Sequence, residues 1–361
     1  MLPYFDNAVM IGIGCVLIYL AIKKRYEPLL LLPIGFGAIL VNIPFSGLME
    51  SDGILRVIYD LGIANELFPI LIFVGIGAMI DFGPLLDRPW VILLSVPAHL
   101  GIFVSLILAL SMGFDPFEAS AIGIVGAMDG PTAILVTSKF APDLLGSITV
   151  CAYSYMSAIP IIQVPLSKLL TTRKERLVRM EYKPGAYSRT VRILFPITVT
   201  LITGIVAPAG VALMGSLMLG NFLKESGVAD RLSKSAENEI SNVSTLLLGI
   251  AIGGTMIADR FLTIETLLIF ALGIVAFVSG LAFGIIFAKI ANVLTKGKIN
   301  PLIGATAVSA FPMAARTAHM IGRQEDPDNW LLMHAMAANT GGQIASVVAG
   351  GIILTFAPLL T

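Results

Sequence analysis

Charge is scarce in this 361-residue chain. Lys, Arg, Asp and Glu supply 13% of the residues and hydrophobic residues supply 57%, whereas soluble domains have about 25% charged and 45–50% apolar residues. Most of the uncharged runs reach the ~20 residues that a membrane-spanning helix needs. These runs cover residues 7–22, 28–49, 193–223, 266–288 and 329–361. Their Leu, Ile, Val and Gly blocks lack the alternation of barrel strands, so the sequence predicts an all-α polytopic membrane protein.

Residues that commonly bind metals are also few. Cys15 and Cys151 lie in apolar runs, where they are typical packing residues, and His99, His319 and His334 are scattered. No spacing of a zinc or iron site is present. No basic cluster is interleaved with aromatic residues, so nucleic acid is not expected as a partner.

One carboxylate stands out against this background. Asp129 is the only charged residue between Glu118 and Lys139, and it lies in the run Ala127-Met128-Asp129-Gly130-Pro131-Thr132, where glycine and proline interrupt an apolar segment. A charge at mid-bilayer costs roughly 2.5–3.5 kcal/mol on insertion scales. Asp129 is therefore predicted to belong to an ion or proton site, and a buried ion pair with Arg316 is the alternative.

The chain contains an internal repeat. Residues 122–133, IGIVGAMDGPTA, align with residues 303–314, IGATAVSAFPMA, and bring the prolines of the two segments into register. Earlier in each half, residues 76–81 resemble residues 252–259. Because the order is the same, the sequence predicts two homologous halves.

Positive charge predicts how the halves are oriented. Residues 168–192 carry eight basic residues, and cytoplasmic loops collect Lys and Arg. This segment is interpreted as a cytoplasmic linker between a first membrane repeat, 1–167, and a second, inverted one, 193–361. Each repeat then has about five spanning helices and one broken re-entrant segment. The broken segments, around Asp129 and Pro312, are predicted to meet near the midplane from opposite faces, as in ion transporters.

Oxygen-bearing side chains near the two breaks are the candidate ligands for a hard monovalent cation. They are Asp129, Asn300, Ser309, Asn339 and Thr340. Gln343 and Ser346, in the same polar patch, fit an ion site and simple helix packing equally well.

Two further residues are candidates for chemistry. Tyr155 is either an interfacial anchor or a buried hydroxyl, and its alignment with Thr340 in the repeat favours the interior. Arg316 follows the second break, where its forked guanidinium is suited to bind a carboxylate. A snorkelling arginine is the alternative for Arg316.

From these residues alone, a secondary Na⁺ symporter or Na⁺/H⁺ antiporter is the favoured function, because an inverted repeat with a midplane carboxylate describes that class. A passive membrane anchor would explain the basic linker but not Asp129.

Four stretches carry a family resemblance. They are LLPIGFGAILVNIPF at 31–45, GAMDGPTAI at 126–134, INPLIGATAVSAFPMAARTAH at 299–319 and DPDNWLLMHAMAANTGGQIAS at 326–346. With them, nearly the whole chain resembles the β subunit of the biotin-dependent, sodium-translocating decarboxylases, which act on oxaloacetate, methylmalonyl-CoA, malonyl-CoA or glutaconyl-CoA. The resemblance implies a primary sodium pump in the plasma (inner) membrane of a prokaryote. In such a pump a biotin carrier delivers carboxybiotin, and the β subunit decarboxylates it, takes up a proton and exports Na⁺.

The resemblance also suggests roles for individual residues. The family's functional positions fall on Asp129, Tyr155, Asn300, Gly304, Ser309 and Arg316. The resulting hypothesis has three parts. Na⁺ binds at Asp129, Asn300, Asn339 and Thr340; Arg316 holds the carboxylate of carboxybiotin; and the hydroxyl of Tyr155 or Ser309 relays the proton. Some relatives have Gly-Pro-Asn where this chain has Ala337-Ala338-Asn339, which puts the fine ion geometry in doubt.

The expected partners follow from what the chain lacks. It has no biotinyl-lysine motif and no soluble carboxyltransferase domain, so a biotin carrier and a carboxyltransferase must be separate subunits. A small membrane subunit is also expected, and a homo-oligomer is left open. Residues 168–192 and 224–243 are candidate docking surfaces.

Overall fold

The computed structural model describes residues 4–182, 185 and 187–359, and in these residues it has helices and no strand. The predicted all-α class is confirmed. Positions 183–184 and 186 of the predicted linker lie outside the described residues.

The first half begins with membrane helices and ends with a bent pair. Its longer elements are α1 (Phe5–Tyr19), η1 (Leu20–Lys24), α2 (Pro28–Val41), α3 (Ile54–Gly62), α4 (Leu67–Met79), α7 (Leu100–Ser111), α8 (Pro116–Gly123), α9 (Gly130–Phe140), α10 (Leu145–Ser157) and α11 (Ile159–Leu170). The shorter ones are α5 (Gly83–Asp87), η2 (Pro89–Leu94), α6 (Ser95–Ala98), η3 (Ile124–Ala127) and η4 (Pro142–Leu144).

The second half follows the short linker helix α12 (Arg173–Arg176). Its longer elements are α13 (Arg189–Val206), α14 (Val211–Ser226), α16 (Ser241–Thr255), α18 (Ile264–Leu294), α19 (Met313–Glu325) and α20 (Leu332–Phe356). The shorter ones are η5 (Pro208–Gly210), α15 (Asp230–Ser235), η6 (Ala236–Ile240), α17 (Ala258–Phe261), η7 (Pro301–Thr306) and η8 (Ala357–Leu359).

The membrane character of the chain is evident in its helices. Among the described residues, five helical segments are long and apolar enough to cross a membrane. The number is up to seven if two bent pairs each count as one span, α3 with α4 and the η4–α10 segment with α11. The polytopic class is thus confirmed. The count of about ten crossings stays a prediction, because α2 is apolar but has only 14 residues.

Helices of the two halves pack against one another in pairs. Helix α2 packs on α16, and α4 packs on α14. Both contacts need glycine, because a Cβ on Gly37 would lie 2.4 Å from the Ile250 carbonyl oxygen, and one on Gly220 would lie 1.9 Å from that of Val74. The halves therefore interlock.

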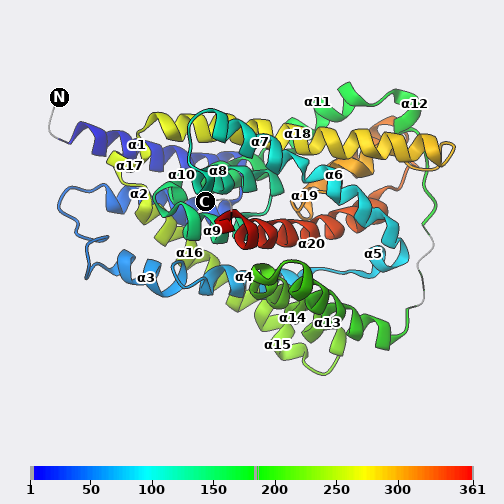
Figure 1. Ribbon diagram of the computed structural model, residues 1–361, viewed down its shortest axis with the longest axis horizontal. Coiled ribbons are helices and arrows are strands. Elements are labelled where there is room, and N and C mark those ends of the chain that lie inside the picture. Colours follow the sequence, from blue (N-terminus) through cyan, green and yellow to red (C-terminus); the bar gives the residue numbers. More distant parts are fainter. Residues whose placement is uncertain (1–3, 183–184, 186, 360–361) are drawn as a thin grey trace.

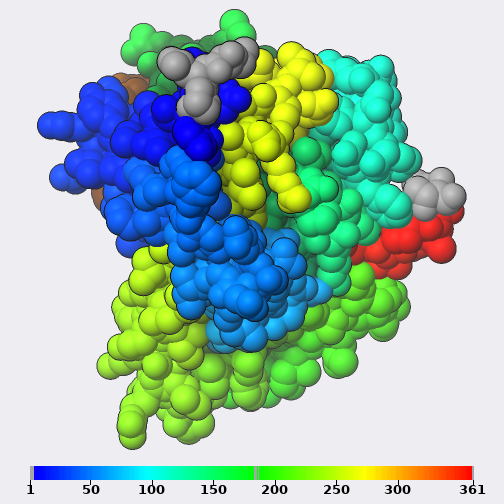
Figure 2. All heavy atoms as spheres, turned by 90° about the vertical axis from the view of Figure 1, so that its left-hand side faces the viewer, coloured from blue at the N-terminus to red at the C-terminus, as the bar shows by residue number. Residues whose placement is uncertain are grey.

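The linker and the first inter-helix loops mark opposite ends of the molecule. In Figure 1, α5 and α12 lie at the right-hand end, whereas the start of α1, α3 and α17 lie at the left. Seen from the left-hand end, the N-terminal segment (blue) lies beside the start of α18 (yellow) (Figure 2). Segments of both halves thus contribute to the end opposite the linker.

Candidate functional site

The first helix break lies between η3 and α9. Met128 takes a left-handed conformation with φ 58°, and Asp129 is extended at the N-cap of α9. Pro131 near the start of α9 has no N–H to donate, so it begins the new helix without losing a bond. This local sequence stops one helix and starts another around a buried carboxylate.

The second break joins η7 to α19, and it meets the first. Between Thr306 and Met313 the chain is not helical. The Ser309 hydroxyl donates to the carbonyl oxygen of Ala127 at 2.9 Å, directly beside the first break. Helix α20 crosses the junction closely at Gly342, where a Cβ would lie 2.4 Å from the Val308 carbonyl oxygen.

Asp129 lies among neutral hydrogen-bond donors. Its Oδ2 accepts from the Thr132 hydroxyl at 2.9 Å, the Gln343 amide at 3.0 Å and the Ser346 hydroxyl at 2.6 Å. No side chain of the described residues donates to Oδ1. Hydrogen bonds to a charged acceptor are worth about 1.5–3 kcal/mol each, so these three donors offset part of the cost of burying an ionised carboxylate.

Asn339 adds a second oxygen to the junction. Its amide nitrogen donates to the Val308 carbonyl at 2.6 Å, while its buried Oδ1 has no hydrogen-bond partner. Because a buried oxygen without a donor is costly, this atom is suited to accept a cation. The next residue, Thr340, donates back to the Ala337 carbonyl at 3.0 Å, which leaves its oxygen as an acceptor.

Asn300 belongs to different surroundings. Its amide nitrogen donates to the carbonyls of Arg176 and Val178, both at 2.9 Å, and its Oδ1 accepts from the Leu302 N–H at 3.0 Å. The amide is thus fully engaged with the linker and with the N-terminus of η7. The structure does not bring this predicted ligand together with Asp129.

The two tyrosines of α10 face opposite ways. The hydroxyl of Tyr155 donates to the Phe270 carbonyl of α18 at 2.6 Å, and the side chain is half-buried. Its ring also contacts Phe270 and Phe277 of α18. Tyr153 instead lies against the first break, because a Cβ on Gly130 would be 2.1 Å from its ring.

Comparison with known proteins identifies the family. Residues 6–357 match the family described as the Na⁺-transporting oxaloacetate decarboxylase beta subunit. The glutaconyl-CoA decarboxylase subunit beta of Acidaminococcus fermentans is 50% identical over 97% of this chain and 93% of that one. This chain belongs to the decarboxylase beta-subunit family.

Other members of the family are similar along nearly their whole length. The methylmalonyl-CoA decarboxylase subunit beta of Veillonella parvula is 48% identical over 96% of this chain and 92% of that protein. The oxaloacetate decarboxylase beta chain of Klebsiella pneumoniae is 40% identical over 97% and 95%. Family membership and the long apolar helices make this beta subunit a multi-pass protein of a prokaryotic plasma membrane.

Arg316 of this beta subunit lies on α19, just after the second break, and its side chain is exposed. Within the described part of the chain it makes no ion pair or hydrogen bond. The alternative of a buried ion pair with Asp129 is therefore not found.

Three residues of the site region were not among the predicted candidates. Thr132 donates to Asp129, Tyr153 packs on Gly130, and Asn329 binds the linker. A signal existed for Thr132, since a hydroxyl three residues after the N-cap lies within reach of the N-cap side chain. Tyr153 and Asn329 meet partners that are distant in sequence, and no local pattern reveals those contacts.

Proposed function

We propose that this chain is the membrane subunit of a primary Na⁺ pump, which decarboxylates carboxybiotin and couples that reaction to proton uptake and Na⁺ export. The observation that carries the proposal is the buried Asp129 carboxylate, surrounded by neutral donors where the two helix breaks meet. Family membership supports the chemistry and the ion.

Na⁺, as cargo, binds at the junction of the breaks and α20. Asp129 supplies the charge, and the buried Oδ1 of Asn339 supplies an oxygen that lacks a donor. The hydroxyl oxygens of Thr340 and Ser309 lie on the same elements. We do not include Asn300 among the ligands, because both polar atoms of its amide are already hydrogen-bonded to the linker and to Leu302.

Arg316 is proposed to hold the carboxylate of the incoming carboxybiotin. Its guanidinium is exposed and without a partner, so it is available for a bidentate contact. Decarboxylation breaks the N–CO₂ bond, leaves the electron pair on the ureido nitrogen of biotin and requires one proton there. Ser309 is favoured over Tyr155 as the relay for that proton, because the Ser309 hydroxyl lies between the breaks whereas the Tyr155 hydroxyl is bonded to Phe270.

Coupling has a clear energetic requirement. Moving one positive charge outward against about 150 mV costs roughly 3.5 kcal/mol, and each tenfold concentration ratio adds about 1.4 kcal/mol. CO₂ release meets this cost only if Na⁺ occupancy changes the face to which the site opens. Two broken segments that enter from opposite faces are suited to that exchange.

The domain organisation and the partners are part of the same proposal. Residues 1–167 and 193–361 form inverted repeats joined by the cytoplasmic linker 168–192. The same order of elements in both halves supports this, from the paired helices α1–α2 and α13–α14 to the two breaks. Relatives are named as beta subunits of larger decarboxylases. A biotin carrier, a carboxyltransferase and a small membrane subunit are accordingly the proposed partners.

The test measures CO₂ release from a radiolabelled carboxylated biotin carrier, using membranes that contain this chain and its co-expressed partner subunits. Release is measured with and without Na⁺ for wild type and for Asp129→Asn. We expect Na⁺-stimulated release by wild type and its loss in Asp129→Asn, because the neutral amide cannot balance the charge of the ion.

Two results would contradict the proposal. Unchanged Na⁺ dependence in Asp129→Asn would remove the carboxylate from the ion site. No release by wild type, with Na⁺ uptake into vesicles intact, would make this chain a secondary symporter or antiporter.

A further inference from the structure

The linker contacts the second half through residues 176–180, which are the end of α12 and the non-helical segment after it, here called the strap. Three of its alternate carbonyls accept side-chain donors. Asn300 donates to the carbonyls of Arg176 and Val178, both at 2.9 Å, and Asn329 donates to the same two at 3.0 and 3.3 Å. The third, of Met180, lies 3.1 Å from His334 Nε2. The backbone of the strap is therefore held by side chains of the second half.

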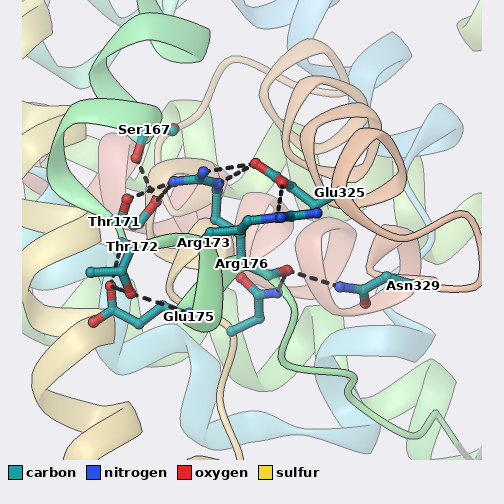
Figure 3. A network of polar contacts seen from close by, with 9 residues as sticks. Ser167, Thr171, Thr172, Arg173, Glu175, Arg176, Glu325 and Asn329 are labelled. Atoms are coloured by element: carbon teal, nitrogen blue, oxygen red, sulfur yellow. Dashed lines mark hydrogen bonds and ion pairs between the residues drawn. The ribbon is translucent and has the colours of Figure 1, made fainter.

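Ion pairs fix the strap at its outer edge (Figure 3). The Arg176 guanidinium lies 2.7 Å from Glu325, and these side chains are only 11% and 16% exposed. Arg179 donates to both oxygens of Asp326, at 2.6 and 2.9 Å. The hydrogen bond from Arg179, with one from the Asp328 N–H, holds the pKa of Asp326 below its usual value.

The groups that hold the strap come from both ends of the second broken segment. Asn300 lies just before η7, and Glu325 is the last residue of α19. Asn329 lies just before α20, and His334 lies in the first turn of that helix. Ser309 and Arg316 lie between these attachment points. The strap thus ties the two ends of the segment that carries them.

The segment that follows the strap attaches to the first half. The Tyr182 hydroxyl donates to Asp87 Oδ2 at 2.6 Å, and the Gly185 N–H donates to Asp87 Oδ1 at 2.8 Å. Asp87 ends α5, directly after the helix pair α3–α4. The linker therefore connects the second broken segment to the end of α5 in the first half.

We propose that the strap holds the second broken segment in the position in which the site binds Na⁺. Asn329 is then a positioning residue that acts through the strap. This rests on the proposed function. Asn300 then has the same role, and it affects the ion site through the strap and not as a ligand.

Asn329 is the best residue to test. It is fully buried, and its amide nitrogen serves two carbonyls of the strap. Its replacement leaves Asn300 as the remaining side-chain donor to those carbonyls. The attachment of the strap is therefore weakened and not lost. The loss of two hydrogen bonds is enough to raise the population of a detached strap about tenfold.

The first readout is tryptic cleavage on the cytoplasmic side of inverted vesicles, followed by mass spectrometry. Cleavage after Arg176 or Arg179 requires the strap to detach, whereas cleavage after Lys296, which is exposed in a turn outside the strap, is an internal reference. For Asn329→Ala we expect the initial cleavage at Arg176 and Arg179, relative to Lys296, to rise about tenfold, because proteolysis follows the open population. Asn329→Asp keeps the side-chain size but removes the amide donor, so it serves as a second variant if Asn329→Ala fails to accumulate.

The matched control is Asn238→Ala. Asn238 is exposed, and its amide donates to the Lys234 carbonyl of its own helical segment at 2.9 Å. This variant should leave cleavage of the strap unchanged.

The second readout is the Na⁺ dependence of decarboxylation. For the Asn329 variants we expect the Na⁺ concentration at half-maximal rate to rise at least threefold, with the rate at saturating Na⁺ within about twofold of wild type. Unchanged cleavage would overturn the anchoring by Asn329, and faster cleavage with unaltered Na⁺ dependence would overturn the positioning role. Absence of Na⁺-stimulated release in wild type would remove the proposed function and the positioning role together, while the cleavage ratio still decides the anchoring.

Discussion

At the scale of single residues, the polar patch of α20 shows what a sequence leaves undecided. Gln343 and Ser346 suit helix packing and an ion site equally well, because both roles use small or polar side chains on one helix face. The structure resolves their contacts, since both donate to Asp129. They lie three residues apart on α20, so one face of this helix presents both to the first break.

Ser346→Ala is predicted to weaken the use of Na⁺. The hydroxyl donates to Asp129 at 2.6 Å, so its loss removes one of the three donors that hold this carboxylate in place for the ion. We expect the Na⁺ concentration for half-maximal decarboxylation to rise roughly tenfold, at the lower end of about 1.5–3 kcal/mol for a bond to a charged acceptor.

Ser279→Ala is the control for that prediction. Its hydroxyl donates only to carbonyls of its own helix, at 2.6 and 3.1 Å. An equal effect of both substitutions on Na⁺ dependence would contradict a specific role of Ser346.

Tyrosine and asparagine positions show which contacts a sequence leaves unspecified. Tyr153 and Tyr155 are two residues apart on a helix, so their side chains diverge by about 200°. The repeat alignment favoured an interior position for Tyr155, which is half-buried and donates to the Phe270 carbonyl, while Tyr153 lies against Gly130. Asn300 donates to carbonyls more than 100 residues earlier in the chain, and no local pattern reveals such a contact.

At the scale of elements, both helix breaks could be predicted because their causes are local. Gly130 and Pro131 define the first, and Pro312 precedes α19 at the second. Proline cannot donate in a helix interior and clashes with the preceding turn. How closely α20 approaches the breaks could not be predicted, because glycines in an apolar helix are common and only some face a neighbouring backbone.

Gly342→Ala tests that close approach. An added Cβ would lie 2.4 Å from the Val308 carbonyl oxygen, so α20 must move away from the junction. Overpacking of this kind costs about 1–3 kcal/mol. We expect a lower midpoint of thermal unfolding for the detergent-solubilised protein and a large loss of Na⁺-stimulated decarboxylation.

Gly12→Ala on α1 is the matched control, since nothing lies within 4 Å of its added Cβ. It should retain both stability and activity, because alanine is the better helix former. Wild-type behaviour of Gly342→Ala would show that the junction tolerates separation.

At the scale of the whole molecule, the two halves interlock through equivalent contacts. Helix α2 of the first half packs on α16, and α14 of the second half packs on α4. In the predicted repeat, α2 corresponds to α14 and α4 to α16, so each contact is the counterpart of the other. Such reciprocal packing is expected when two halves are related by a two-fold axis in the membrane plane.

The inverted orientation makes a direct prediction about two aligned residues. Asp143 follows the helix after the first break and Asp328 follows the helix after the second; their side chains are 75% and 81% exposed. In an inverted repeat these positions lie on opposite faces of the membrane. In a chain without native cysteines, Asp143→Cys should react with an impermeant maleimide only from outside, and Asp328→Cys only from inside. Labelling of both from one side would mean that the broken segments open to the same face, and the proposed exchange of Na⁺ between faces would lose its structural basis.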